Sequence, residues 1–217
     1  CAVAFAMPAA AEDLSKWSYV GVAENDVFDY ADLNTDRYYT HGTQFAAMSP
    51  PIEYETVLWP AKLSRFLEVP KDSSDGRPSK IQIRWGVELG QNIYTPESLA
   101  PIPDPKDHPY AGWTYVGAMV ASYSPTEANT LELQVGLVGP SSGSAWIQNH
   151  FHDLIRAARF QGWDHQLNDE IAFVVLAERR WTPKRIYPRD AGDNPKWAVD
   201  HTEHLDLAAG TVQVSDA

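Results

Sequence analysis

Strict alternation between apolar and polar positions marks two segments of this chain as β-strands. In residues 131–137 every odd position is apolar and every even position is polar or glycine. In residues 81–89 five apolar residues alternate with Gln82, Arg84, Gly86 and Glu88. Because successive strand side chains point to opposite faces, each segment has one apolar and one polar face. Burying Arg84 and Glu88 in a soluble core would be costly unless they paired. A barrel wall with lipid outside and a polar interior accepts the pattern.

Weaker alternation predicts further strands at residues 17–24, 39–48, 113–123, 171–181 and 199–214, the last as one or two strands. The connections differ in length, with a short polar turn at 124–129 and long segments at 94–110 and 140–169. Outer-membrane barrels have such an asymmetry, with short periplasmic turns and long external loops. We therefore expect an all-β fold: a transmembrane antiparallel β-barrel, of which this chain supplies an incomplete portion. An aromatic-rich soluble β-sandwich is the alternative.

Strand parity predicts that four polar segments meet at one rim of this barrel. If residue 17 begins the first strand at the periplasmic end, the opposite rim collects the end of that strand, the start of the second, the segment Tyr94-Thr95-Pro96 and the segment around His152. Residues 50–79 are long for a periplasmic connection, and a short helix is expected within them at 62–66.

A short amphipathic helix is predicted after the strand at 131–137. Gly139-Pro140-Ser141-Ser142 ends that strand. Apolar residues then recur at helical spacing: they are Ile147, Phe151, Leu154, Ile155 and Ala158. Gln148 and His152, four residues apart, lie one above the other on this helix.

His152 is the leading candidate for a general base, because imidazole titrates near neutrality and Gln148 can hold a neighbouring group in place. A lone helical histidine is nevertheless more often a surface or packing residue. His150 points to another side of the helix, and without an HExxH pattern a zinc site is not expected. Ser141 and Ser142 lack the nucleophile-elbow pattern and are read as capping residues.

Composition narrows the function further. The 217 residues carry a formal charge of -12 and include one cysteine. Nucleic acid is excluded as a partner, since phosphate binding needs clustered Lys and Arg. Residues 1–11 are uncharged and end in Ala9-Ala10-Ala11, as the remnant of a secretory signal peptide would, which leaves residues 12–217 as the barrel domain.

An acidic stretch follows the first predicted strand and offers the hard oxygen ligands that calcium takes. It contains Glu24, Asp26, Asp29, Asp32 and Asp36. It does not have the spacing of an EF-hand loop. A solvated acidic loop is the plainer interpretation.

Seven motifs follow one another along residues 17–181. They are Glu24-Asn25-Asp26, Asp36-Arg37-Tyr38-Tyr39-Thr40-His41-Gly42, Tyr94-Thr95-Pro96, His108-Pro109-Tyr110-Ala111-Gly112-Trp113, Val138-Gly139-Pro140-Ser141-Ser142, Gln148-Asn149-His150-Phe151-His152 and Gly162-Trp163-Asp164-His165-Gln166. As an ordered set they resemble the lipid A 3'-O-deacylase family of outer-membrane barrels. The resemblance implies a twelve-stranded barrel of the bacterial outer membrane that removes the 3'-linked acyloxyacyl chain of lipopolysaccharide, with calcium as cofactor.

Residue by residue, the resemblance implies that His152 is the catalytic base, which deprotonates the attacking water, and Gln148 its partner. The other matched catalytic positions are Asn25 and Thr40, and Asp26 is the matched metal position. The resemblance also implies that lipopolysaccharide is the substrate and that lipids of the outer membrane surround the barrel.

One position departs from the pattern that the resemblance implies. A glutamate is expected six residues after the catalytic histidine, and this chain has Ala158 there. Asp153, Asp164 and Glu170 are candidates to replace it. A noncatalytic barrel that binds lipopolysaccharide or serves as a scaffold is the main alternative, and a phospholipase barrel is a nearer one in chemistry.

Overall fold

The computed structural model describes residues 16–25, 41–53, 82–98, 100–123, 127–186 and 199–211. Strands dominate these ranges. They are β1 (Ser18–Asn25), β2 (His41–Met48), β3 (Ile52–Glu53), β4 (Gln82–Tyr94), β5 (Ala111–Tyr123), β6 (Glu127–Val138), β7 (Glu170–Ile186) and β8 (Val199–Gly210). The connection between β6 and β7 holds the helix α2 (Ser144–Ile155) between two 3-10 helices, η3 (Pro140–Ser142) and η4 (Gly162–His165).

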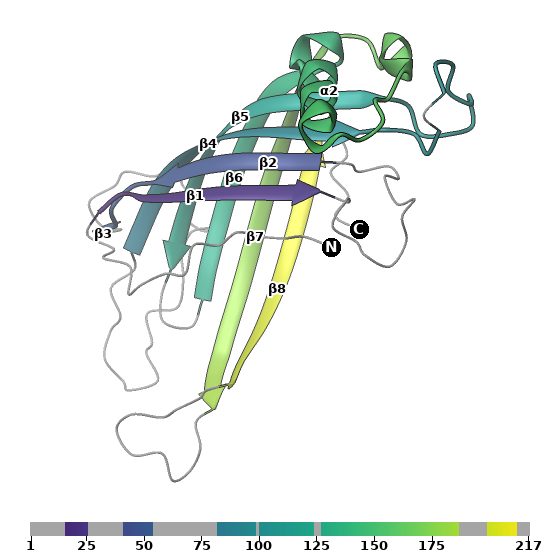
Figure 1. Ribbon diagram of the computed structural model, residues 1–217. Helices are drawn as coiled ribbons and strands as arrows, with labels where there is room; N and C mark the ends of the chain where they lie inside the picture. The colour runs from purple at the N-terminus through teal and green to yellow at the C-terminus, as the bar shows by residue number, and fades with distance from the viewer. Residues whose placement is uncertain are drawn as a thin grey trace.

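The strands form one antiparallel sheet. Each strand pairs with the next in the order β1-β2-β4-β5-β6-β7-β8, and β3 pairs with the start of β4. Figure 1 shows that the strand direction rotates from β1 at one edge to β8 at the other, so the sheet is twisted and curved like a barrel wall. The expected all-β antiparallel fold is confirmed.

The two faces of the sheet have the polarity of a barrel wall in lipid. On β4, Trp85, Val87 and Leu89 are exposed, whereas Arg84 and Glu88, which alternate with them, are buried. On β6, Leu133, Val135 and Leu137 are likewise exposed and Gln134 is buried. The soluble-sandwich alternative is therefore wrong, because it requires the apolar face to lie in a core.

The buried polar side chains of the inner face satisfy one another. Glu88 accepts hydrogen bonds from the amide nitrogen of Gln134, at 2.8 Å, and from that of Gln44. Arg84 donates from Nε to the carbonyl oxygen of Ser49 at 2.6 Å and from Nη2 to Ser18. Buried polar and charged groups are tolerated when they are hydrogen-bonded in this way.

Several strands extend beyond the ranges that alternation predicts. The strand expected at 81–89 continues to Tyr94, and the one at 131–137 begins at Glu127. Within the stretch expected as one or two strands at 199–214, the described residues form the single strand β8. The helix expected at 62–66 lies outside the described residues. No helix in the described ranges is long and apolar enough to cross a membrane.

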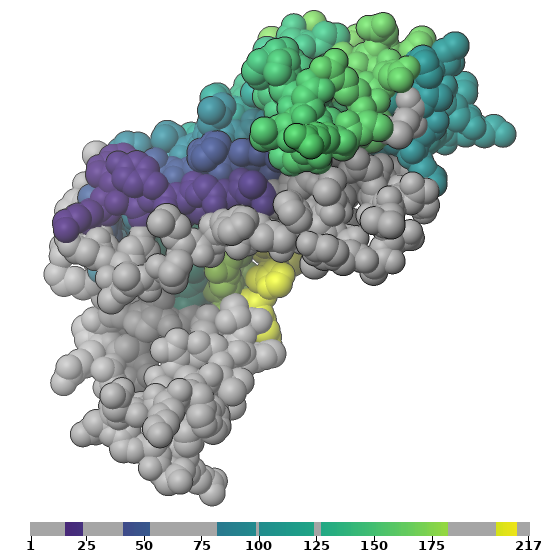
Figure 2. All heavy atoms as spheres, in the orientation of Figure 1, coloured from purple at the N-terminus to yellow at the C-terminus, as the bar shows by residue number. Residues whose placement is uncertain are grey.

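The predicted common rim is confirmed by the strand register. At this rim Asn25 pairs with His41, and His41 pairs with Ile93. Further along, Trp113 pairs with Val138, which pairs with Glu170. The connection with α2 rises from the rim as a raised cap (Figure 2). Residues distant in sequence are thus brought to one end of the sheet.

Candidate active site

Helix α2 starts where it does because η3 is anchored to the ends of two strands. The carbonyl oxygen of Ser142 accepts hydrogen bonds from Thr114 Oγ1 at 2.8 Å and from Gln91 Nε2 at 3.1 Å. Asp169, just before β7, accepts from the backbone N–H of Ser141 at 2.7 Å and from its hydroxyl at 2.8 Å. Gly143 then takes a left-handed conformation, with φ 72°, and the helix begins. The prediction that these serines cap the helix is wrong, because the N-cap of α2 is Gly143 and no side chain caps it; Ser141 and Ser142 instead anchor η3 to the neighbouring strands.

The helix faces the rim with its polar side. Ser144, Gln148 and His152 follow one another at intervals of four residues and are 1%, 2% and 4% exposed. On the opposite side Trp146 and Leu154 are 65% and 80% exposed. This is the reverse of an ordinary amphipathic surface helix. A buried polar stripe at a sheet rim needs partners for its polar atoms, and these partners define the site.

The imidazole of His152 is held by the chain that follows the helix. Nδ1 lies 2.5 Å from the carbonyl oxygen of Ala158. A carbonyl oxygen only accepts, so Nδ1 carries a proton, and in the neutral imidazole the lone pair is then on Nε2. The ring of Phe160 packs edge-on at a centroid distance of 5.5 Å. No hydrogen bond to Nε2 is formed within the described residues, which leaves that nitrogen available as a proton acceptor.

The amide of Gln148 is oriented by Trp163. The indole N–H of Trp163 donates to Gln148 Oε1 at 2.9 Å. Because an indole only donates, the oxygen must face it and the NH₂ group must point the other way. That nitrogen is buried and has no hydrogen-bond partner among the residues that the structure describes. The site therefore contains a buried, unpaired hydrogen-bond donor one helical turn from His152.

An aromatic cluster behind these two residues fixes their positions. It consists of Ile93, Tyr110, Phe160 and Trp163, all buried. The rings of Tyr110 and Trp163 lie 5.0 Å apart. Burial raises the pKa of the Tyr110 hydroxyl above its ordinary value of 10.0, so this residue stays neutral. The sequence placed Trp163 in one of the seven motifs but did not indicate its contact with Gln148.

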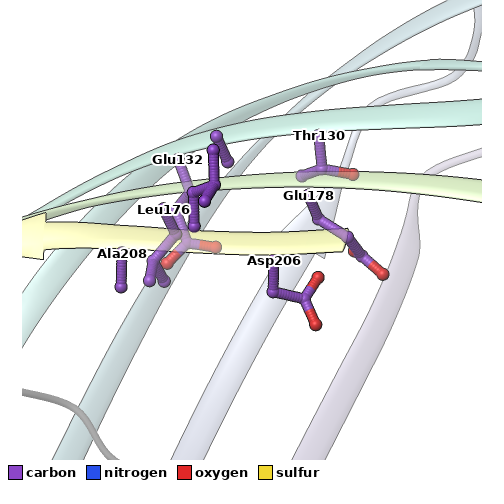
Figure 3. A pocket seen from close by; sticks show the side chains of 8 residues that line it. Thr130, Glu132, Leu176, Glu178, Asp206 and Ala208 are labelled. Carbon is purple, nitrogen blue, oxygen red and sulfur yellow. The ribbon is translucent and has the colours of Figure 1, made fainter. Parts of the chain in front are cut away.

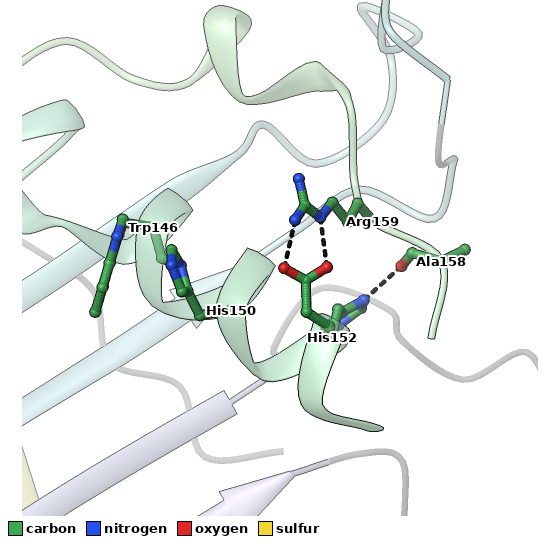
Figure 4. Close-up of polar contacts among 6 residues, drawn as sticks. Trp146, His150, His152, Ala158 and Arg159 are labelled. Carbon is green, nitrogen blue, oxygen red and sulfur yellow. Dashed lines mark hydrogen bonds and ion pairs between the residues drawn. The ribbon is translucent and has the colours of Figure 1, made fainter. Parts of the chain in front are cut away.

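His150 has no part in this arrangement. Its ring stacks on Trp146 at a centroid distance of 4.1 Å, and its Nδ1 contacts the Trp146 carbonyl oxygen at 2.7 Å. Figure 4 shows both side chains on the other side of the helix from His152. The prediction that His150 points elsewhere is confirmed.

The other residues expected at the site are less fully described. The backbone of Asn25 pairs with His41 at the rim, and the ring of His41 stacks on Phe151 of α2 at 5.9 Å. Helix and first hairpin therefore meet at this end. The side chain of Asn25 lies outside what the structure describes, as do Asp26 and Thr40, so their expected roles stay predictions.

The described residues supply no carboxylate cluster for a metal ion. Among them no three His, Cys, Asp or Glu side chains are grouped closely enough to hold one. Of the three expected substitutes for position 158, Asp153 is paired with Arg159, and Asp164 and Glu170 are exposed. Calcium remains a prediction that depends on Asp26 and its neighbours, outside the described ranges.

A separate hollow lies further along the sheet from the rim. Residues of β6, β7 and β8 line it, among them Glu132, Glu178 and Asp206 (Figure 3). Arg180 forms an ion pair with Glu178 beside it. The hollow contains no residue of α2, so it is distinct from the His152 site.

Taken together, an outward apolar face, a polar interior and a rim that carries a polar-faced helix define an outer-membrane β-barrel wall. The family model described as outer membrane protein LpxR matches residues 1–217. The chain belongs to this family and is an outer-membrane protein, which confirms the resemblance at the level of the family.

One solved structure supports the fold. LpxR from Salmonella typhimurium is similar with a TM-score of 0.62 and 16% sequence identity, over 91% of this chain. The chain spans 59% of the length of that protein. A comparison with curated proteins found no match.

Proposed function

We propose that this protein is a lipid A deacylase that hydrolyses the 3'-linked acyloxyacyl ester of lipopolysaccharide. The observation that carries the proposal is the state of His152, a buried imidazole whose Nδ1 is occupied by the Ala158 carbonyl and whose Nε2 is available. Membership of the LpxR family and the place of the helix at the rim of an outer-membrane sheet support it.

In this proposal Nε2 of His152 takes a proton from water as the water oxygen attacks the ester carbonyl. A tetrahedral oxyanion forms. When it collapses, the bond to the sugar oxygen breaks and the imidazolium returns its proton to that oxygen. The products are a free hydroxyl on the sugar and the released acyloxyacyl carboxylic acid. General-base assistance of this kind contributes roughly 10²- to 10⁴-fold to the rate.

Gln148 is proposed to donate a hydrogen bond during the reaction. Its NH₂ group is buried, has no partner in the described part of the chain and is fixed in direction by Trp163. A donor held in this way stabilises an oxygen that gains negative charge without having to reorganise. Asn25 and Thr40 are proposed as further polar groups of the site, from the first hairpin.

Calcium, held by Asp26, is the proposed cofactor. When bound, it would act as a Lewis acid toward the developing oxyanion. Since Ala158 contributes only its backbone to the site, the carboxylates for the metal would come from the acidic stretch after β1. Calcium dependence is therefore a separate arm of the test below.

The test is mass spectrometry of lipid A after lipopolysaccharide is incubated with the full-length, detergent-purified protein, with calcium or with chelator. We expect loss of one acyloxyacyl unit, abolished by His152→Ala. The matched control is His150→Ala, which removes the exposed histidine two residues away and should leave the rate unchanged. Equal activity of the His152→Ala variant would remove His152 from the mechanism.

A noncatalytic barrel that binds lipopolysaccharide is the second candidate. The observation in its favour is Ala158, where the resemblance implies a glutamate. It predicts unaltered lipid A under every metal condition, while the folded wild-type protein still binds lipopolysaccharide. Release of fatty acid by the wild-type protein would exclude it.

A further inference from the structure

The turn after α2 has an unusual conformation. Arg156 follows the helix with φ 59°, and within the described residues it is the one non-glycine residue with positive φ. The N–H of Arg156 bonds to the Asp153 carbonyl oxygen at 3.3 Å, and the N–H of Ala157 to the His152 carbonyl oxygen at 2.9 Å. These two bonds form a Schellman motif, in which glycine is the usual left-handed residue. An arginine there costs about 1–2 kcal/mol, so other contacts must hold the turn.

Two parallel links close this turn, and each spans six residues. The first is the hydrogen bond from His152 Nδ1 to the Ala158 carbonyl oxygen. The second joins the next residue on each side: Arg159 Nε donates to Asp153 Oδ1 at 2.6 Å, and Arg159 Nη2 bonds to Oδ2. Figure 4 shows the two links beside each other. The ion pair thus lies directly next to the bond that fixes the catalytic imidazole.

We propose that the Asp153–Arg159 ion pair is a positioning device for His152: it holds the turn so that the Ala158 carbonyl stays on Nδ1. As a step in catalysis this inference rests on the proposed function. The pair touches no reacting atom. Its effect is to keep the proton on Nδ1 and the lone pair on Nε2.

Stability alone does not account for this pair. The two side chains are 58% and 45% exposed, and exposed ion pairs contribute little to the stability of a fold. A carboxylate in the last turn of a helix also opposes the helix dipole. Its two-point contact with the guanidinium, in contrast, fixes geometry as a single contact does not.

The pair is charged under any condition in which deacylation would be measured. The Arg159 guanidinium lowers the pKa of the Asp153 carboxyl below its ordinary value of 3.8. Asp153 in turn raises the pKa of Arg159. The Asp153–Arg159 ion pair is therefore present throughout the neutral pH range.

The test compares full-length Asp153→Asn, Arg159→Gln and the charge-swapped double variant Asp153→Arg with Arg159→Asp. The first readout is the ¹⁵N NMR spectrum of the histidine ring nitrogens, which reports the tautomer of His152; its signals are assigned as those lost in His152→Ala. The second is kcat and KM for lipid A. Arg180→Gln is the control, because it breaks another ion pair, Arg180–Glu178, away from α2.

We expect His152 to populate both tautomers in each single variant. We also expect kcat to fall about tenfold with KM unchanged, because misplacing a catalytic group by 1 Å can lower the rate by up to about a hundredfold. The charge-swapped variant should recover much of the wild-type tautomer and of the wild-type kcat. Arg180→Gln should change neither the tautomer nor kcat. A wild-type tautomer and kcat in both single variants would overturn the proposal. If the wild-type protein has no activity, the proposed function fails, and the tautomer readout alone still decides the positioning role.

Discussion

Trp163 and Gln148 are joined by a 2.9 Å hydrogen bond from the indole N–H to the amide oxygen, although they lie in different helices of the rim connection. Both side chains are buried. The direction of this bond determines that Gln148 presents its NH₂ group, not its oxygen, to the interior of the site. Trp163, which takes no part in the proposed reaction, thus determines that Gln148 offers a hydrogen-bond donor to the site.

Trp163→Phe should therefore reduce activity without unfolding the protein. Phenylalanine keeps a ring in the aromatic cluster but leaves Gln148 Oε1 unpaired, at a cost of about 1–3 kcal/mol. The amide is then free to turn over, and we expect kcat to fall about tenfold. The measurement is the rate of lipid A deacylation, with heat-modifiable gel migration to verify folding. Trp146→Phe, on the exposed side of α2, is the control, and an equal loss in that variant would contradict the role of Trp163.

Gly112→Ala should displace the start of α2 from the rim. A Cβ atom at this position would overlap with the side chains of Ser142 and Ser144. Overpacking of this kind typically costs about 1–3 kcal/mol, and here it would also shift the helix that carries His152. We expect a folded barrel with strongly reduced deacylation. Gly21→Ala, where the nearest atom would lie 3.5 Å away, should be neutral. Normal activity of Gly112→Ala would show that the helix position is not critical.

Alternation predicted the faces of the strands because it is a local property of the sequence. Trp85 and Val87 face outward and Glu88 faces inward, because successive side chains of a strand point to opposite faces. The strand ends were predicted less well. Gly90, Gln91 and Asn92 carry no apolar alternation, yet they continue β4 because β5 pairs with them. Tertiary pairing, not side-chain pattern, decides these boundaries.

The candidate site was predicted only in part. The spacing of Gln148 and His152 indicated that they share a helix face, but periodicity does not say which face packs inward. The apolar residues at helical spacing suggested that the apolar side packs inward. In the structure Leu154, on that side, is exposed. The contact of Trp163 with Gln148 and the pairing of Asp153 with Arg159 depend on how the chain folds back after the helix. No sequence signal marks such contacts.

The pH dependence of the Asp153–Arg159 pair follows from the lowered pKa of Asp153. Arg159 is the main cause of this lowering, and His150 and His152 add to it. A carboxyl with a lowered pKa stabilises the fold above its ordinary pKa and loses this effect as pH falls through the lowered one. The difference in thermal midpoint between wild type and Asp153→Asn should be small from about pH 5 upward, where Asp153 is ionised in both the folded and the unfolded protein. It should disappear in stronger acid. A difference that grows toward acid would contradict this account.

Lysine substitutions at two neighbouring positions of β6 should have opposite consequences. Leu133 is exposed on the apolar outer face, whereas Gln134 is buried on the inner face between Glu88 and Glu132. Leu133→Lys should destabilise the protein by about 2–4 kcal/mol if the position lies at the middle of the bilayer, and by less near an interface. Gln134→Lys places its charge beside two carboxylates and should be tolerated. The measurement is denaturant-dependent folding into lipid vesicles. A greater loss for Gln134→Lys than for Leu133→Lys would mean that the faces of the sheet are assigned the wrong way round, because a lysine is costly only where no carboxylate or water can reach it.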